Sequence, residues 1–208
     1  SGKTKILKLP KGNCLGFEFT PDEKKIVIIF DSPQNPNDIY VYDIKKEKYR
    51  QITFSMIGGI PRNHFVLPKE ISYKSFDGLE ISGFMYLPRG TKKDGTNPAI
   101  VWPHGGPEWQ EKVLFHKFFQ IFTNYGYIVI APNFRGSTGY GKTFQRMIYK
   151  DWGGAEFKDV LGAHQYLIDS GYVDSKKIAV VGGSFGGFMT LTCVTKAPDL
   201  WKCAIDIF

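Results

Sequence analysis

A serine between closely spaced glycines is the residue of this sequence best suited to covalent chemistry. Ser184 lies between Gly182 and Gly186 in a Gly-x-Ser-x-Gly motif. The apolar run 178–181 before it is typical of a buried parallel strand, and the apolar residues after it have helical spacing. Such a tight strand-to-helix turn leaves the serine hydroxyl exposed as a nucleophile, beside the positive end of the helix dipole. The plain alternative is a small-residue loop that closes an ordinary strand–helix unit.

A second motif could supply hydrogen bonds to a developing oxyanion. The sequence His104-Gly105-Gly106-Pro107 follows an apolar strand predicted at 99–102. A glycine turn in this position can present backbone N–H groups to a negatively charged oxygen, as an acyl-transfer reaction requires. A Gly-Gly-Pro turn needs no chemistry when taken alone, and it is the serine motif downstream that favours the catalytic interpretation.

The segments around these motifs alternate between strands and helices, which indicates an α/β fold with a mainly parallel sheet. A hairpin is expected over 71–76 and 79–87. Further strands are predicted at 99–102, 127–131, 178–181 and 202–208, and helices at 112–125, 139–149, 156–170 and after the serine. Both motifs therefore come directly after a predicted strand.

The first 60 residues have a different pattern, with alternating segments and no helical spacing. Four short strands are predicted, at 15–19, 25–30, 38–43 and 49–53. This arrangement is typical of one blade of a β-propeller, which needs neighbouring blades to bury both of its faces. An independent small β-sheet is the alternative. Residues 54–63, which contain two glycines and a proline, are interpreted as a linker.

Composition excludes several classes of function. The chain has 208 residues, 42% of them hydrophobic, and its apolar runs are too short to span a membrane. The formal charge of +7 is spread along the chain, with 11 Lys and Arg against 7 Asp and Glu in 1–62 and 16 against 13 in 63–208. No nucleic-acid surface is therefore predicted. Three cysteines lack metal-ligand spacing, which indicates buried thiols in a reducing, cytoplasmic location and no metal site.

Four motifs occur in an order that resembles the prolyl oligopeptidase family of serine peptidases, with the acylaminoacyl-peptidase branch most similar. They are His-Gly-Gly-Pro at 104–107, Asn-Phe-Arg-Gly-Ser-Thr-Gly-Tyr-Gly at 133–141, Asp-Trp-Gly-Gly at 151–154 and the serine motif at 182–186. The resemblance covers essentially the whole chain. It implies an α/β-hydrolase fold, incomplete at its C-terminal end, formed by the N-terminal two-thirds of a catalytic domain at 61–208. The last blade of a β-propeller would precede it at 1–60.

The resemblance also implies roles for single residues. Ser184 would be the nucleophile, and the N–H groups of Gly106 and Phe185 would form the oxyanion hole. The Phe185 side chain would line an apolar pocket for the residue on the acyl side of the cut. The substrate would be a short peptide. The resemblance implies no metal or organic cofactor for the protein, and no nucleic-acid or membrane partner. A homo-oligomer could form through the full-length protein.

The triad histidine and aspartate are expected outside this sequence. In the α/β-hydrolase fold they follow the nucleophile in the order Ser, Asp, His. All four histidines precede the serine, and they are His64, His104, His116 and His164. Asp206, on the next predicted strand, is interpreted as structural. The chain is therefore expected to be a fragment, truncated at both ends.

The predicted function is a serine peptidase that hydrolyses short peptides, of the acylaminoacyl or dipeptidyl type. Arg135 is interpreted as tying loops together rather than touching substrate, and Asp151 and Asp159 as residues of helix ends and ion pairs. Two alternatives remain. One is a carboxylesterase on the same fold, which would not need the propeller-like blade. The other is a non-catalytic interaction protein that retains the fold.

Overall fold

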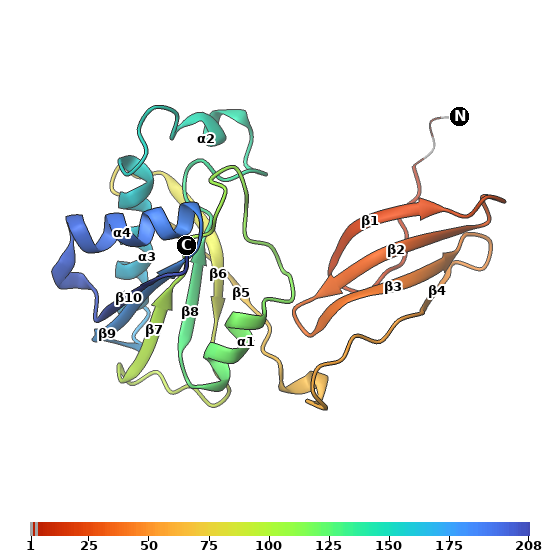
Figure 1. The fold of residues 1–208 in the computed structure, drawn as a ribbon, viewed down its shortest axis with the longest axis horizontal. Helices are drawn as coiled ribbons and strands as arrows, with labels where there is room; N and C mark the ends of the chain where they lie inside the picture. The colour runs from red at the N-terminus through yellow and green to blue at the C-terminus, as the bar shows by residue number, and fades with distance from the viewer. Residues whose placement is uncertain (1, 3) are drawn as a thin grey trace. The chain divides into compact units, whose positions relative to one another are not determined.

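The computed structural model describes residue 2 and residues 4–208, which form two compact units. The first unit comprises the described residues of 1–67 together with 113–117, and the second comprises 68–112 and 118–208. Each unit has its own sheet and its own apolar core. Figure 1 labels the elements of both.

The first unit is a four-stranded antiparallel sheet in which the strands lie in chain order (Figure 1). Its strands are β1 (Asn13–Phe19), β2 (Lys25–Ser32), β3 (Asn35–Asp43) and β4 (Lys48–Gln51). Side chains alternate between the two faces of a strand. One face therefore buries a small core of Ile26, Ile28, Phe30, Tyr40 and Tyr42. On the opposite face, the cross-strand pair Ile29 and Ile39 stays 45% and 38% exposed.

Residues 113–117 pack in the first unit, which corrects one predicted helix. The apolar spacing predicted a helix over 112–125, but α1 (Lys117–Asn124) begins five residues later. The Phe115 N–H donates to Asp31 Oδ2 at 3.3 Å, and the Phe115 ring lies edge-on to Phe65 with ring centroids 5.2 Å apart. These contacts hold the segment outside the helix, and neither partner is close to it in sequence.

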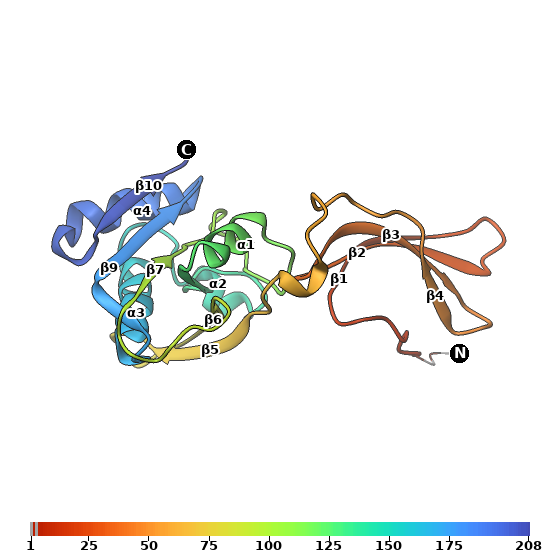
Figure 2. The same ribbon diagram turned by 90° about the horizontal axis from the view of Figure 1, so that it is seen from below.

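The second unit contains a mixed six-stranded sheet in the order β10-β9-β7-β8-β6-β5. Its strands are β5 (Lys69–Lys74), β6 (Glu80–Tyr86), β7 (Asn97–Val101), β8 (Ile128–Pro132), β9 (Val173–Gly182) and β10 (Cys203–Asp206). The four strands from β10 to β8 are parallel, whereas the β5–β6 hairpin adds to β8 in the antiparallel direction. The mainly parallel sheet and its hairpin are as predicted. Figure 2 shows this sheet curving from β5 to β10.

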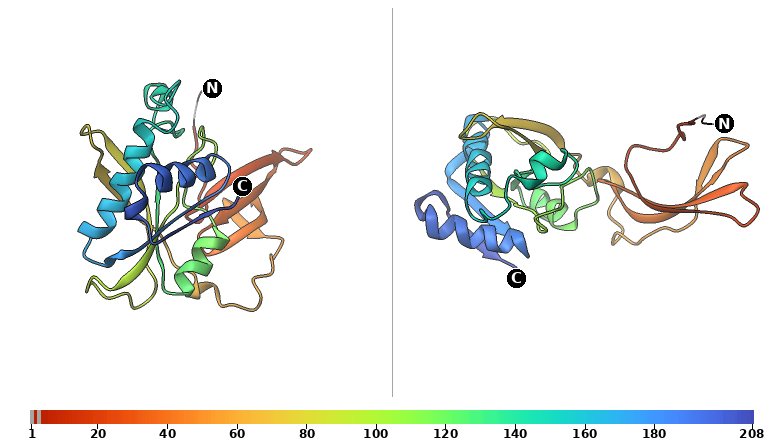
Figure 3. Two further views of the ribbon diagram at one scale, coloured as in Figure 1. Left: turned by 60° about the vertical axis from the view of Figure 1, so that its left-hand side comes forward. Right: turned by 90° about the horizontal axis from the view of Figure 1, so that it is seen from above.

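Helices cover both faces of this sheet. On one face, α3 (Ala155–Asp169) and α4 (Phe185–Lys196) pack over the strands, as the left view of Figure 3 shows. Their apolar residues share a core with alternate strand residues such as Val101, Ile130 and Val180. The side chains between these positions point to the other face. There the Phe119 ring of α1 packs against Trp102, with centroids 5.4 Å apart and the rings nearly perpendicular.

The predicted helix over 139–149 is also shorter in the structure. It forms only as α2 (Lys142–Arg146), followed by turns up to residue 150. Gly141 before it has φ 89°, a left-handed conformation outside the helical region. Lys150 after it also has a positive φ, of 65°. The chain from 147 to 152 is therefore free to form a loop, and that loop lines the candidate site.

Candidate active site

Ser184 occupies a strained turn between β9 and α4. Its φ and ψ of 56° and −124° are uncommon for a residue with a side chain. The turn is held by backbone hydrogen bonds on both sides. The Ser184 N–H donates to the Phe208 carbonyl at 2.7 Å, and the Phe188 N–H donates to the Ser184 carbonyl at 3.0 Å. The strain is the cost of a tight turn between a strand that ends at Gly182 and a helix that begins at Phe185.

The glycines around Ser184 are required because three backbone segments touch there. A Cβ atom on Gly182 would lie 2.3 Å from the Gly186 carbonyl oxygen. A Cβ atom on Gly186 would lie 2.2 Å from the carbonyl oxygen of Pro103. Both distances are far inside van der Waals contact. The end of β9, the start of α4 and the loop after β7 are thus packed backbone against backbone.

The loop after β7 brings the His-Gly-Gly-Pro motif onto the serine. A Cβ atom on Gly105 would lie 3.4 Å from Ser184 Cβ and 3.9 Å from Ser184 Oγ. Gly106 has φ 126°, in the region that glycine alone adopts readily. The structure therefore brings Gly105 against Ser184, with Gly106 the next residue of the facing loop and Phe185 the residue after the serine.

His104 fixes the orientation of that loop. It is 1% exposed, and its ring stacks on Phe134 with centroids 4.2 Å apart. Burial lowers the pKa of His104 to about 4, so the ring is neutral. Its Nδ1 donates to the Gly105 carbonyl at 2.7 Å, and Nε2 lies 2.7 Å from the Ser137 hydroxyl. Because the C=O and N–H of a trans peptide point in opposite directions, the Gly106 N–H is turned away from the imidazole.

Two backbone donors in this region have no partner among the described residues. Within the part of the chain that the structure describes, neither the Gly106 N–H nor the Phe185 N–H donates a hydrogen bond. Phe185 is the first residue of α4, where N–H groups lack acceptors inside the helix. Unpaired N–H groups beside an exposed hydroxyl can bind an anionic oxygen.

The Phe185 side chain lies mostly in the core. Its ring is 6% exposed and stacks with Phe134 at a centroid distance of 5.9 Å. On its outer side it meets the edge of Trp152, with centroids 5.3 Å apart, and Trp152 is 62% exposed. Trp152 belongs to the Asp-Trp-Gly-Gly motif, but the sequence predicts no role for it. Its exposure beside the serine depends on tertiary packing, which no local pattern reveals.

Arg135 has the structural role that the sequence favoured. It is 5% exposed, and its Nε and one terminal nitrogen both donate to Asp159 at 2.8 Å. Its other terminal nitrogen donates to Asp77 Oδ2 at 2.8 Å. The Arg135 hydrogen bonds hold the pKa of Asp77 at about 2, well below its usual range. Asp151 accepts from the Ala155 N–H at the start of α3.

The remaining predicted residues lie in packing positions. His164 Nε2 is 3.0 Å from the Leu200 carbonyl, and its ring lies edge-on to Trp201. Burial lowers the pKa of His116 to about 4. Asp206 lies against the first turn of α4, where a Cβ atom on Gly187 would come within 2.2 Å of its Oδ1.

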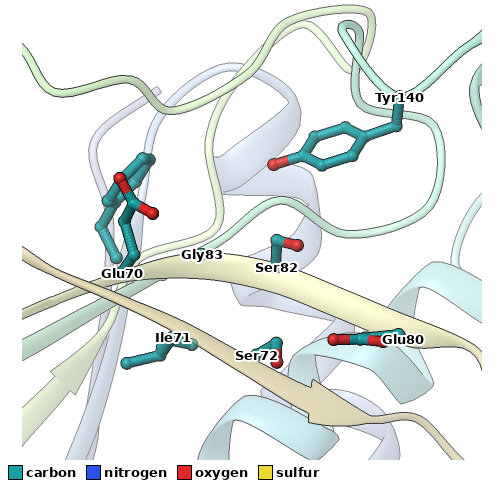
Figure 4. A pocket seen from close by; sticks show the side chains of 8 residues that line it. Glu70, Ile71, Ser72, Glu80, Ser82, Gly83 and Tyr140 are labelled. Atoms are coloured by element: carbon teal, nitrogen blue, oxygen red, sulfur yellow. The ribbon is translucent and has the colours of Figure 1, made fainter.

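Two clefts open on the second unit. One, of about 550 Å³, is lined by Gly106, Pro107, Glu108, Ile148, Tyr149, Lys150 and Trp152, so it adjoins the serine site. The other, of about 500 Å³, lies over the β5–β6 hairpin. Figure 4 shows the Tyr140 ring on one side of it and Glu70, Ser72, Glu80 and Ser82 on the strands opposite.

Neither a metal site nor a membrane span is found in the described chain. Among residue 2 and residues 4–208, no three His, Cys, Asp or Glu side chains are grouped so as to hold a metal ion. Over the same residues, no helix has the length and apolar character needed to cross a membrane.

The chain is similar in sequence to known peptidases. Residues 114–207 match the prolyl oligopeptidase family. An uncharacterized peptidase, YuxL, of Bacillus subtilis is 31% identical over 185 residues, which cover 88% of this chain and 28% of the relative. Dipeptidyl aminopeptidase BIII of Pseudoxanthomonas mexicana is 30% identical over 194 residues, covering 90% of this chain and 28% of that protein. The chain thus spans less than a third of the length of these relatives.

Solved structures give the same picture. The acylaminoacyl peptidase of Pyrococcus horikoshii superposes with a TM-score of 0.82 at 28% identity, over 99% of this chain and 32% of its own. A puromycin-hydrolyzing peptidase of Mycobacterium tuberculosis superposes with a TM-score of 0.80 at 25% identity, over 88% of this chain and 29% of its own. Together with the sheet order and the serine turn, these similarities identify the α/β-hydrolase fold.

Proposed function

Because this chain belongs to the prolyl oligopeptidase family, we propose that it supplies the nucleophile and the oxyanion-binding groups of a serine peptidase. The observation that carries the proposal is the left-handed Ser184, which contacts a glycine loop. The N–H groups of Gly106 and Phe185 beside it have no acceptor in the described residues. An exposed hydroxyl between two such donors suits attack on a carbonyl group.

In the proposed reaction, Ser184 Oγ attacks the carbonyl carbon of the scissile amide and gives its proton to a base. The electron pair of the C=O bond moves to the oxygen, which the Gly106 and Phe185 N–H groups stabilise. The intermediate collapses by breaking the C–N bond, and the leaving amine takes the proton from the base. Water then hydrolyses the acyl-serine ester by the same steps.

The base is proposed to be a histidine outside residues 1–208. Both ring nitrogens of His104 are engaged, by the Gly105 carbonyl and by Ser137. His164 faces the Leu200 carbonyl and Trp201. A neutral His104 instead acts as a positioning residue, since it fixes the carbonyl of the peptide whose N–H belongs to Gly106. The base would be oriented by a carboxylate, as in other triads.

The proposed substrates are short peptides, cleaved in the dipeptidyl or acylaminoacyl manner after which two of the similar proteins are named. The first unit has its own sheet with two distinct faces. Besides its buried face, it exposes Ile29 and Ile39, which a stack of sister sheets would cover. We therefore propose that the first unit is one blade of a β-propeller.

Labelling with a fluorophosphonate tests the nucleophile in the full-length protein. We expect one adduct on Ser184, located by peptide mass spectrometry, and peptide hydrolysis that disappears on labelling. Ser184→Ala should abolish the adduct and lower kcat/KM by about 10⁴-fold or more, because triad members act as a unit.

Ser82 provides a matched control. It lines the cleft over the β5–β6 hairpin and has the same hydroxyl chemistry without the strained turn. Ser82→Ala should keep both the adduct and the activity. An adduct that survives Ser184→Ala at full yield contradicts the proposal.

A further inference from the structure

The cleft lined by Gly106, Pro107, Ile148, Tyr149 and Trp152, here called the Trp152 cleft, lies directly beside the proposed reaction centre. Glu108 and Lys150 complete its lining. Gly106 belongs both to this lining and to the proposed oxyanion hole. On the other side, the Trp152 ring meets the ring of Phe185, whose backbone carries the second proposed donor.

The lining of the Trp152 cleft is mainly apolar and includes large exposed rings. Trp152 and Tyr149 are 62% and 51% exposed, while Pro107 and Ile148 are buried beneath them. Glu108 is the acidic residue of the lining, and its carboxylate is already engaged. Its Oε1 accepts from the Tyr149 hydroxyl and its Oε2 from Gln145 Nε2, both at 2.7 Å. Concave apolar sites with exposed aromatic rings bind apolar groups.

The wall that carries Trp152 is anchored on both sides. Lys196 Nζ of α4 donates to the Gly153 carbonyl at 2.6 Å. The Asp151 carboxylate accepts from the Ala155 N–H at 3.1 Å, which ties the loop to the start of α3. The centroid of the Trp152 ring also lies 6.3 Å from the centroid of the Phe188 ring. A ring fixed before binding loses little conformational freedom when a ligand arrives.

We propose that the Trp152 cleft is a substrate subsite that binds a large apolar or aromatic side chain of a residue next to the scissile bond. This inference rests on the proposed function, which places the scissile carbonyl oxygen at the Gly106 and Phe185 N–H groups. Successive residues of an extended peptide are about 3.5 Å apart. A side chain on either side of the bond therefore reaches a cleft that begins at Gly106. Its volume of about 550 Å³ accommodates the largest side chains.

Selectivity measurements on the full-length protein test the inference. Two series of short peptides would be used, one with Gly, Ala, Leu or Phe before the cut and one with the same residues after it. In one of the series, Trp152→Ala should lower kcat/KM for the Phe-containing peptide by about 10-fold or more. It should change kcat/KM for the Gly-containing peptide less than about 2-fold. The series that responds identifies the side of the bond. Trp152→Phe should restore most of the preference, because it keeps an aromatic wall.

The controls separate a lost subsite from lost catalysis. Hydrolysis of p-nitrophenyl acetate, whose acyl group is too small to reach the cleft, measures any loss of catalysis in Trp152→Ala, and the kcat/KM values for the peptides are divided by it. Tyr125→Ala removes another exposed ring, 76% exposed and absent from the cleft lining, and should leave the selectivity unchanged. If Trp152→Ala cleaves all peptides with the selectivity of wild type, the inference is wrong and the proposed function stands. If wild type shows no Ser184-dependent cleavage, both are wrong.

Discussion

Gly106 must satisfy two conditions that only a residue without a side chain meets. Its φ of 126° lies where a Cβ atom is strained, and that Cβ would lie 2.8 Å from the Glu108 nitrogen and 3.0 Å from Trp109 Cβ. Any larger residue therefore has to move the loop. A movement of a few tenths of an ångström at Gly106 shifts the N–H proposed to bind the oxyanion, and hydrogen-bond strength depends steeply on that geometry.

Gly106→Ala should lower kcat by on the order of 10²-fold, the effect of losing one oxyanion donor, with little change in KM. Gly90→Ala is the matched control. Gly90 also has a positive φ, of 73°, but a Cβ atom there would have no neighbour within 4 Å. Gly90→Ala should lower the free energy of unfolding by about 1–2 kcal/mol and leave kcat unchanged. Steady-state kinetics and urea denaturation of both variants check this, and equal kcat values would refute the assignment of Gly106.

At the scale of elements, Arg135 joins three parts of the second unit. Its guanidinium links the loop after β8 to Asp159 of α3 and to Asp77 at the turn of the β5–β6 hairpin. Asp159 is fully buried and forms a salt bridge with this guanidinium at 2.8 Å. The Arg135 guanidinium also lies over the Phe76 ring at 5.0 Å. The turn of the hairpin is thus tied to α3 by one side chain far from it in sequence.

Arg135→Ala should destabilise the protein by about 3–5 kcal/mol, because it leaves the buried Asp159 carboxylate without its cationic partner. Arg135→Lys should recover only part of this loss, since an ammonium cannot replace the two parallel hydrogen bonds to Asp159. The exposed pair of Lys177 and Asp174 is the comparison, and Lys177→Ala should cost less than about 1 kcal/mol. Chemical denaturation measures all three. A loss in Arg135→Ala as small as that in Lys177→Ala would contradict the role given to this pair.

The elements that the sequence predicted well are those with a strong local pattern. The apolar run before Ser184, the glycines after it and the hairpin at 71–87 each indicate their structure within a few residues. The predicted helix start at 112 was wrong because distant contacts decide it, whereas the helix predicted over 139–149 was cut short by the positive φ values of Gly141 and Lys150. Phe115 is held by Asp31 and Phe65, partners about 80 and 50 residues away. Trp152 was missed for the same reason, since its place beside Phe185 depends on how a loop and a helix meet.

At the scale of the whole molecule, buried ionisable groups set the pH dependence of folding. Burial lowers the pKa of His104 and of His116 to about 4 from the ordinary 6.5. The unfolded chain therefore binds more protons than the folded chain between pH 6.5 and 4, and stability falls as the pH decreases through this range. Burial raises the pKa of Glu111 to about 7. This shift has the opposite effect, because it lowers the free energy of unfolding as the pH rises toward 7.

His104→Gln isolates one of these contributions. Between pH 7.5 and pH 5, wild type should lose about 2 kcal/mol more unfolding free energy than the variant, because only wild type must keep the His104 imidazole neutral, whereas both proteins contain His116. Urea denaturation of both proteins at the two pH values measures the difference. Equal losses would show that His104 does not fold as a neutral, buried ring.

The backbone contacts around Ser184 have a consequence for engineering. Any substitution at Gly182 or Gly186 places an atom about 2.3 Å from a carbonyl oxygen of a neighbouring segment. In random libraries that include these positions, most variants would misfold. Trp152 and Tyr149 are exposed, and their side chains can change size without touching those contacts. A directed-evolution search for altered selectivity at the proposed subsite should therefore randomise Tyr149 and Trp152, and it should leave the buried Ile148 and the serine turn as they are.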